Sequence, residues 1–336
     1  MTPLTRRTVL AAACVLPTTA AAQPSTSMIT GVNLAGLEFN SGRAGRLDHD
    51  FVAPTAAELD YYHAAGARAV RIPFRWERAQ PELSGRLNED YVGLLDRLVD
   101  ESGRRRMRIV LDPHQYGRRI ETGEPAIIGE SAVTAAHFAA FWGALARRYR
   151  SADHAIFGLQ NEPHDQDTGV LIAVLNAAIV AIRAAEARQL ILAPGNHWSG
   201  AHAWLQRGNA AVLGLRDPGG NMALDVHQFL DADSSGTNAS CPAGAGNRLE
   251  RFTAWARQNR QKAFLSEFGA GPNAACAREL TMLLEHMAAN RDVWIGWTYW
   301  AGGPWWDEDY PLSIAPLSMR TPEHRPQMRI LQRFFQ

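Results

Sequence analysis

Eight short apolar or β-branched runs recur along the 336-residue chain and constrain its fold more than any other feature. Most are continuous rather than alternating, as expected for strands buried on both faces of a parallel sheet. The eight runs are Ile29–Leu34, Ala69–Phe74, Met107–Leu111, Ala155–Gln160, Gln189–Ala193, Met222–Val226, Ala263–Ser266 and Val293–Trp300.

Helical patterns separate many of these runs. They cover Glu89–Glu101, Val133–Arg150, Val170–Arg188, Arg248–Gln261 and Ala277–Asn290, and the final RPQMRILQRFF is typical of a closing helix. Eight strand and helix units predict an α/β protein that forms a single (β/α)8 TIM barrel over residues 23–336. The alternative is a doubly wound open sheet, but no GxGxxG motif follows the first run, which argues against dinucleotide binding.

The first 22 residues have the pattern of an export signal. Arg6-Arg7 precedes a weakly apolar stretch from Val9 to Leu16, and three alanines end at Ala22. The paired arginines resemble a twin-arginine signal, although two arginines in an ordinary secretory signal would look similar. We therefore expect a protein exported to the periplasm or the medium of a bacterium.

The charge balance bears on the partners of the chain. Thirty-four basic residues balance 34 acidic ones, so no overall field favours nucleic acid or an anionic membrane, and a neutral partner fits better. Neither CxxC nor HExxH occurs, so we expect no metal and no other cofactor. In an exported protein Cys241 and Cys276 are expected to form a disulfide; the alternative is two buried thiols.

Polar residues stand where the apolar runs end. Since the carboxyl ends of barrel strands form the mouth that carries the chemistry of such folds, these residues are candidates for an active site. They include Asn33, Arg71, His114, Asn161, Glu162, Asn196, His197, His227 and Glu267, and the eighth run ends in Tyr299 and Trp300.

Two of these residues are carboxylates that can face one ligand. Glu162 follows the fourth strand and Glu267 the seventh, across the barrel mouth. Paired carboxylates cleave glycosidic bonds, one as the acid and the other as nucleophile or base. Asn161 could hydrogen-bond a sugar hydroxyl, and Arg71 could keep a nearby carboxylate ionised.

Tryptophans support a sugar ligand, because indole faces pack on pyranose rings. The candidates for substrate binding are Trp198, Trp300, Trp305 and Trp306, whereas core packing is the expected role of the tryptophans inside helical patterns, Trp142, Trp204 and Trp255.

These motifs resemble glycoside hydrolase family 5, a family of retaining, cellulase-type barrel enzymes. The matching segments are RIPF, DPHQY, NEP, VHQ, SEFG and YWAGGPWW, which lie between residues 31 and 306 in the order of the family. The stretch HQFLDADSSGTNASC is most similar to a subgroup of endo-β-1,4-glucanases, which also carries cysteines at places similar to Cys241 and Cys276.

The resemblance implies that Glu162 is the general acid/base and Glu267 the nucleophile, with Arg71, His114, Asn161 and His227 around them and Trp300 as the floor of the cleaved sugar's subsite. One position departs from the family.

Phe229 stands where the family usually has a tyrosine whose hydroxyl contacts the nucleophile. Without this donor the pKa of Glu267 should rise. The milder interpretation, which we prefer, is that Arg71 and another hydroxyl, such as that of Tyr299, hold Glu267.

We therefore expect a monomeric, exported endo-β-1,4-glucanase that acts on β-glucan chains. Within the same chemistry the alternatives are a β-mannanase, a β-1,3-glucanase or a xyloglucanase. A non-catalytic carbohydrate-binding barrel, in which Phe229 marks lost activity, and a metal- or phosphate-dependent lyase are the alternatives from other classes.

Overall fold

Eight parallel strands close into a barrel in the order β1-β10-β9-β8-β7-β6-β3-β2, which confirms the predicted (β/α)8 fold. The computed structural model describes residues 27–40, 45–121 and 123–336, so the predicted export signal lies outside the described residues. The barrel strands are β1 (Ile29–Leu34), β2 (Ala69–Phe74), β3 (Arg108–Pro113), β6 (Ala155–Gly158), β7 (Leu190–Pro194), β8 (Met222–His227), β9 (Ala263–Glu267) and β10 (Trp294–Gly302).

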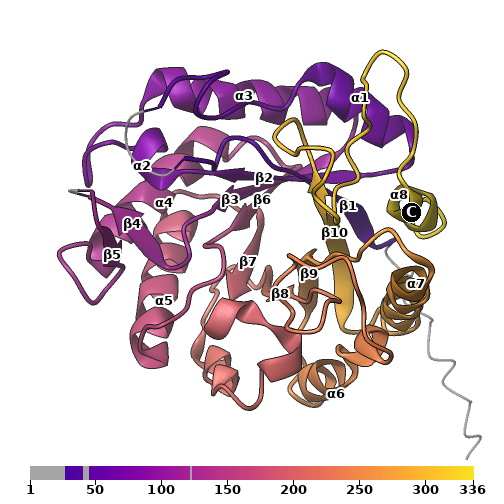
Figure 1. Cartoon of the computed structure of the whole chain (residues 1–336). Coiled ribbons are helices and arrows are strands. Elements are labelled where there is room, and N and C mark those ends of the chain that lie inside the picture. Colours follow the sequence, from indigo (N-terminus) through magenta and orange to yellow (C-terminus); the bar gives the residue numbers. More distant parts are fainter. Residues whose placement is uncertain (1–26, 41–44, 122) are drawn as a thin grey trace, which may run out of the picture.

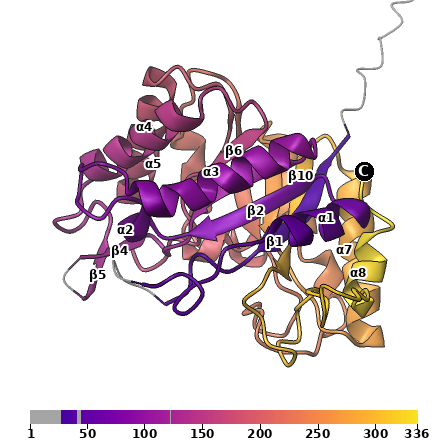
Figure 2. The same ribbon diagram turned by 90° about the horizontal axis from the view of Figure 1, so that it is seen from above.

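The helices lie outside the ring of strands, as Figure 1 and the view from above in Figure 2 show. They are α1 (Ala56–Ala64), α2 (Trp76–Ala79), α3 (Glu89–Arg104), α4 (Ala135–Tyr149), α5 (Thr168–Ala184), α6 (Glu250–Gln258), α7 (Ala274–Ala289) and α8 (Pro326–Leu331). All five predicted internal helices and the closing helix are present, whereas the sequence patterns did not indicate α1 and α2.

Two connections depart from the simple strand–helix alternation. Between β7 and β8 the chain forms three 3₁₀ turns, η1 (His197–Ser199), η2 (Ala201–Ala203) and η3 (Asn209–Gly214); a fourth, η4 (Ala245–Asn247), precedes α6. Between β3 and α4 it forms an antiparallel hairpin of β4 (Arg118–Ile120) and β5 (Pro125–Ile127). Both figures show this hairpin next to α2, outside the barrel.

Side chains that point into the barrel change from apolar to polar along strands β3 and β8. Because neighbouring residues of a strand point to opposite faces, every second residue lies on the inner face. Val110 and Ala223 belong to the apolar cluster that fills the barrel. Two residues further on, the same face of β3 and β8 carries the buried acids Asp112 and Asp225. The polar mouth thus rests on a packed apolar floor.

A register shift places Glu267 at this mouth. The pairing of β8 with β9 runs regularly to Val226, after which His227 pairs with Glu267 instead of Ser266. Such a bulge adds one residue to a strand and re-aims the side chains that follow it. Ser266 accordingly faces Asp225 inside the barrel, while Glu267 also reaches the mouth rather than the helix layer.

The predicted disulfide between Cys241 and Cys276 is present, with 5.0 Å between the two Cα atoms. It joins the connection after β8 to the first turn of α7, on the side of the barrel where Glu267 ends its strand. Among the described residues, no helix is long and apolar enough to cross a membrane.

Candidate active site

The guanidinium group of Arg71 is the centre of the polar mouth. Arg71 is fully buried in the middle of β2, and it donates hydrogen bonds to Glu267 at 2.6 Å, to Asn33 at 2.8 Å and to Asn161 at 2.7 Å. It also lies 3.0 Å from a carboxylate oxygen of Asp112. One cation therefore joins strands β1, β2, β3 and β9 and the segment after β6, and it holds the carboxylate of Glu267 in place.

Glu267 keeps one oxygen for chemistry. Its Oε1 accepts the Arg71 bond, whereas Oε2 lies 3.6 Å from Nδ1 of His227. Burial raises the pKa of Glu267, and the nearby His227 and Arg71 oppose this rise. Arg71 therefore favours the ionised form that a nucleophile requires.

The structure corrects one expectation for this carboxylate. Tyr299 is fully buried, and its hydroxyl donates to the carbonyl of Ala270 at 3.0 Å, so it contacts neither Glu267 nor the mouth. Phe229 packs beside Trp300 and offers no hydroxyl. Of the two side chains expected to hold Glu267, Arg71 contacts it and Tyr299 does not.

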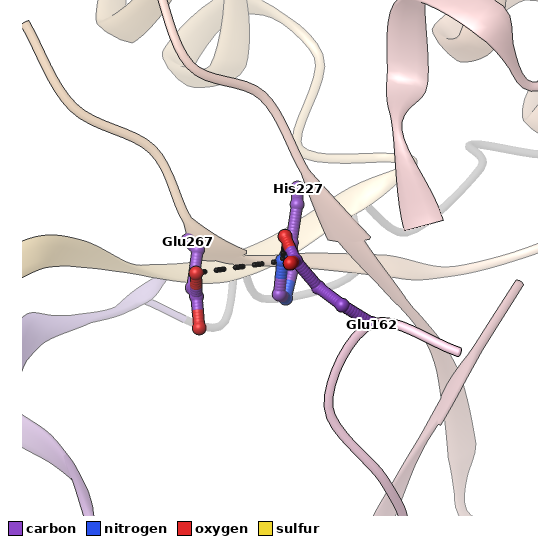
Figure 3. Close-up of side chains that lie close together, drawn as sticks. All are labelled: Glu162, His227 and Glu267. Atoms are coloured by element: carbon purple, nitrogen blue, oxygen red, sulfur yellow. Dashed lines mark hydrogen bonds and ion pairs between the residues drawn. The ribbon is translucent and has the colours of Figure 1, made fainter. Parts of the chain in front are cut away.

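Glu162 and Glu267 face each other across the mouth, with His227 close to both (Figure 3). Each of the three residues offers one nitrogen or oxygen atom, and these three atoms lie within 4.8 Å of one another. A hydrogen bond of 2.7 Å joins Glu162 to Nδ1 of His227. Burial raises the pKa of Glu162 to about 8, with Arg71 opposing the rise, and burial lowers the pKa of His227. At neutral pH Glu162 thus holds a proton that it can donate.

Two buried aspartates that the sequence analysis did not select support the histidines of the site. Asp112 contacts Nδ1 of His114 at 2.8 Å, and a carboxylate oxygen of Asp225 lies 3.8 Å from Nε2 of His227. Both pairs have the spacing Asp-x-His at the end of a strand, which puts the two side chains on one face. This spacing, in LDPHQ and LDVHQ, is the signal that could have revealed them.

Three of the predicted tryptophans line one side of the mouth. Trp300 lies nearly parallel to the ring of His114, at 5.5 Å between centroids, and is 8% exposed. Trp306 packs edge-on against Trp300, and Trp305 stacks on Phe39 at 4.3 Å. This group of rings offers flat faces of the kind on which sugar rings pack.

Trp198 lies on the other side of Glu162, where a cleft of about 470 Å³ opens. It is 48% exposed and stacks on His164 at 4.5 Å. Trp198, His227 and Phe229 line the cleft together with Glu162. The mouth is thus an open groove with aromatic side chains on both sides of the carboxylate pair, a shape that suits a chain molecule.

The three tryptophans for which core packing was expected lie in or against the core. Trp142 and Trp204 are fully buried, and Trp255 packs against the same core while partly exposed.

The spacing of Glu162, His227 and Glu267 would also allow a metal ion to bind. The reaction described below needs no metal, because both its steps use the carboxylates alone.

A closed barrel that holds a pair of carboxylates in an aromatic groove is the arrangement of a glycoside hydrolase. The comparisons with known proteins agree. A family model described as cellulase (glycosyl hydrolase family 5) matches residues 26–303, and the chain belongs to this family.

Similar proteins include fungal and bacterial glucanases. A probable endo-beta-1,4-glucanase B of Aspergillus niger is 34% identical over 85% of this chain and 84% of its own length. Endoglucanase 1 of a Robillarda species is 37% identical over 80% of this chain and 73% of its own. The structure of an endo-beta-1,4-glucanase from Xanthomonas axonopodis pv. citri superposes with a TM-score of 0.87 at 37% identity, covering 93% of this chain and 100% of that one. A structure in complex with cellopentaose also has a TM-score of 0.87, at 38% identity, and covers 92% and 99%.

Proposed function

We propose that the protein is an exported endo-β-1,4-glucanase that cleaves internal bonds of β-glucan chains with retention of configuration. The observation that carries this proposal is the approach of Glu162 and Glu267, whose nearest oxygens lie within 4.8 Å of each other. Retaining enzymes hold their carboxyl groups about 5–5.5 Å apart, whereas inverting enzymes keep about 6.5–9.5 Å for a water molecule. The substrate class rests on the glucanase relatives and the neighbour in complex with cellopentaose.

In the first step Glu267 attacks the anomeric carbon while Glu162 protonates the departing glycosidic oxygen. The bond between sugar and oxygen breaks, and a glycosyl ester on Glu267 forms. The raised pKa of Glu162, about 8, keeps the proton available for this step. Arg71 keeps Glu267 in its ionised form before the attack.

In the second step Glu162, now a carboxylate, removes a proton from water as the water attacks the same carbon. The ester breaks, Glu267 becomes ionised again and the product leaves with its original configuration. His114 and Asn161 line the site between the two glutamates, joined by a 3.2 Å contact. Trp300 is the floor on which the reacting sugar packs.

The test measures reducing ends released by the mature chain from carboxymethylcellulose, mixed-linkage glucan, mannan and xyloglucan, with Glu267→Ala as the blank. A fast fall in viscosity of the cellulose derivative supports internal β-1,4 cleavage. Proton NMR of a short cellooligosaccharide should show the β-anomer first, and an α-anomer would refute retention. Activity on mannan alone would change the substrate, and binding without cleavage would favour a carbohydrate-binding barrel.

Export and oligomeric state are parts of the same proposal. Residues 1–22 carry the signal pattern, and a disulfide outside the cytoplasm would persist. Expression of the full chain in a bacterium should yield a periplasmic product cleaved near Ala22, and replacement of Arg6 and Arg7 by lysine tests the twin-arginine route. Gel filtration should give the mass of a monomer.

A further inference from the structure

A second pocket, of about 260 Å³, lies beside the catalytic groove and has no part in the reaction described above. Its walls come from the segments that follow β2, β3 and β6 and from the β4–β5 hairpin. The side chains that matter are Arg75, Tyr116, Arg118, Arg119, Ile120 and His164. The pocket therefore opens at the mouth of the barrel, on the side of strands β2, β3 and β6.

Aromatic rings separate this pocket from the catalytic groove. The ring of Tyr116 lies 5.4 Å from that of His114 and 5.9 Å from that of His164, and His164 stacks on Trp198. His114 and Trp198 belong to the catalytic groove, whereas the rings that they contact, Tyr116 and His164, line the second pocket. The pocket and the groove thus lie side by side at the mouth, divided by these rings.

The lining of the pocket is basic, with three arginines and no acidic side chain. Two of the arginines have structural contacts. Arg119 lies over the ring of Trp76 at 4.6 Å and donates to the carbonyls of Gln80 and Pro81, which fixes the hairpin. Arg118 donates to the carbonyl of Tyr116 at 2.7 Å, and its contact to Asp165 is long, at 3.5 Å.

Arg75 is different, because its side chain carries a charge without an ionic partner. Its Nε donates to the carbonyl of Glu38 at 2.5 Å, and it makes no ion pair with any acid of residues 27–40, 45–121 and 123–336. The neighbouring carboxyl of Glu38 does not neutralise it below pH 8, because burial raises the pKa of Glu38 to about 8. The two terminal nitrogens of Arg75 remain available as donors.

We propose that this pocket binds a carboxylate on a side group of the glucan chain, with the guanidinium of Arg75 as the main anchor. This inference rests on the proposed glucanase function, since the side group must be carried by the sugar chain in the groove. A guanidinium matches a carboxylate with two parallel hydrogen bonds, which gives both strength and direction. The second cation of Arg118 adds donors, and Tyr116 and Ile120 form less polar walls. The whole chain has no net charge, so the attraction for a carboxylate comes from this pocket and not from the overall charge of the protein.

The test compares kcat/KM on carboxymethylcellulose and on hydroxyethylcellulose of equal chain length and degree of substitution. For Arg75→Gln we expect a loss of about tenfold on the carboxylated polymer, as for one charge-assisted pair. On the neutral polymer we expect the value to stay within twofold. Arg118→Gln should act in the same direction with a smaller loss, and Arg75→Lys should keep part of the preference.

Arg108→Gln is the matched control, because Arg108 also donates to one main-chain carbonyl, that of Asp153, but lies at the opposite end of the barrel. An equal loss on both polymers for Arg75→Gln and Arg118→Gln would overturn the proposal, as would the same selective loss in Arg108→Gln. If Arg75→Gln does not fold, Arg118→Gln alone decides. A wild-type chain inactive on both polymers would instead refute the glucanase function itself.

Discussion

Glu38 gives the sharpest quantitative prediction, because it is a buried acid that forms no ion pair with another described residue. It follows β1, is 3% exposed, and accepts a hydrogen bond of 2.7 Å from the main-chain nitrogen of Gly36. Its other oxygen has no hydrogen-bond partner among the described residues. Burial raises its pKa from 4.5 to about 8. We therefore expect Glu38→Gln to stabilise the protein at alkaline pH.

The magnitude follows from proton linkage. In the unfolded chain Glu38 ionises near 4.5, and in the folded protein near 8. Since the unfolded state then binds fewer protons, the free energy of unfolding falls as pH rises between these values. At about 1.4 kcal/mol per pH unit the upper limit is about 5 kcal/mol. The stability gained by Glu38→Gln should be near zero at pH 4.5, grow through pH 6 and 7, and level off above pH 8.

The assay is urea unfolding followed by tryptophan fluorescence at several pH values between 4.5 and 9, extrapolated to water. Glu285→Gln, on an exposed position of α7, is the control and should show no such trend. The reasoning would be refuted if the free energy of unfolding gained by Glu38→Gln differed by less than about 0.5 kcal/mol between pH 5 and pH 8.5. It would mean that Glu38 is already charged and solvated in the folded protein.

Four further predictions concern the site and the disulfide. The alkaline limb of kcat/KM should lie near pH 8, where Glu162 loses its proton, and a limb near pH 5 would contradict its role as the acid. Phe229→Tyr should shift the acidic limb to lower pH and change kcat less than about tenfold, since Arg71 already holds Glu267; a hundredfold gain would show that Phe229 impairs the wild-type enzyme. Reduction of the disulfide, whose cysteines are 35 residues apart, should lower the free energy of unfolding by about 4 kcal/mol, measured by urea unfolding with and without dithiothreitol. Dialysis against EDTA should leave hydrolysis of carboxymethylcellulose unchanged, and a loss restored by a divalent cation would point to a metal at Glu162 and Glu267.

The barrel could be predicted because its strands are buried on both faces. Such strands are continuous apolar runs in the sequence, and all eight were found within a few residues of their bounds. The site followed from the same reasoning, since Glu162 and Glu267 stand just after their runs and Arg71 is a charged residue within one. The hairpin of β4 and β5 was missed because its strands have three residues each and no apolar alternation.

Strand alternation explains why Tyr299 does not hold Glu267, as had been expected. Trp300 points into the mouth, so its neighbour Tyr299 points to the opposite face of β10, where it packs against Phe268 in the outer layer. The buried acids Asp112 and Asp225 were not selected because the first directly follows an apolar run and the second lies inside one. Besides the histidines two residues away, they contact Arg71 and Ser266, which lie on other strands that are distant in the sequence.

Asn33 makes the chemistry of this protein depend on the order in which the chain is made. Its side-chain amide donates to the carbonyls of Ser266 and Thr298, 233 and 265 residues further along, and its oxygen receives a bond from Arg71. Arg71 in turn holds Glu267. The first and last strands must therefore meet before the nucleophile is fixed in position. A growing chain gains its hydrolytic site only when its final strand has been synthesised, so synthesis intermediates that lack it should be inactive towards glucans.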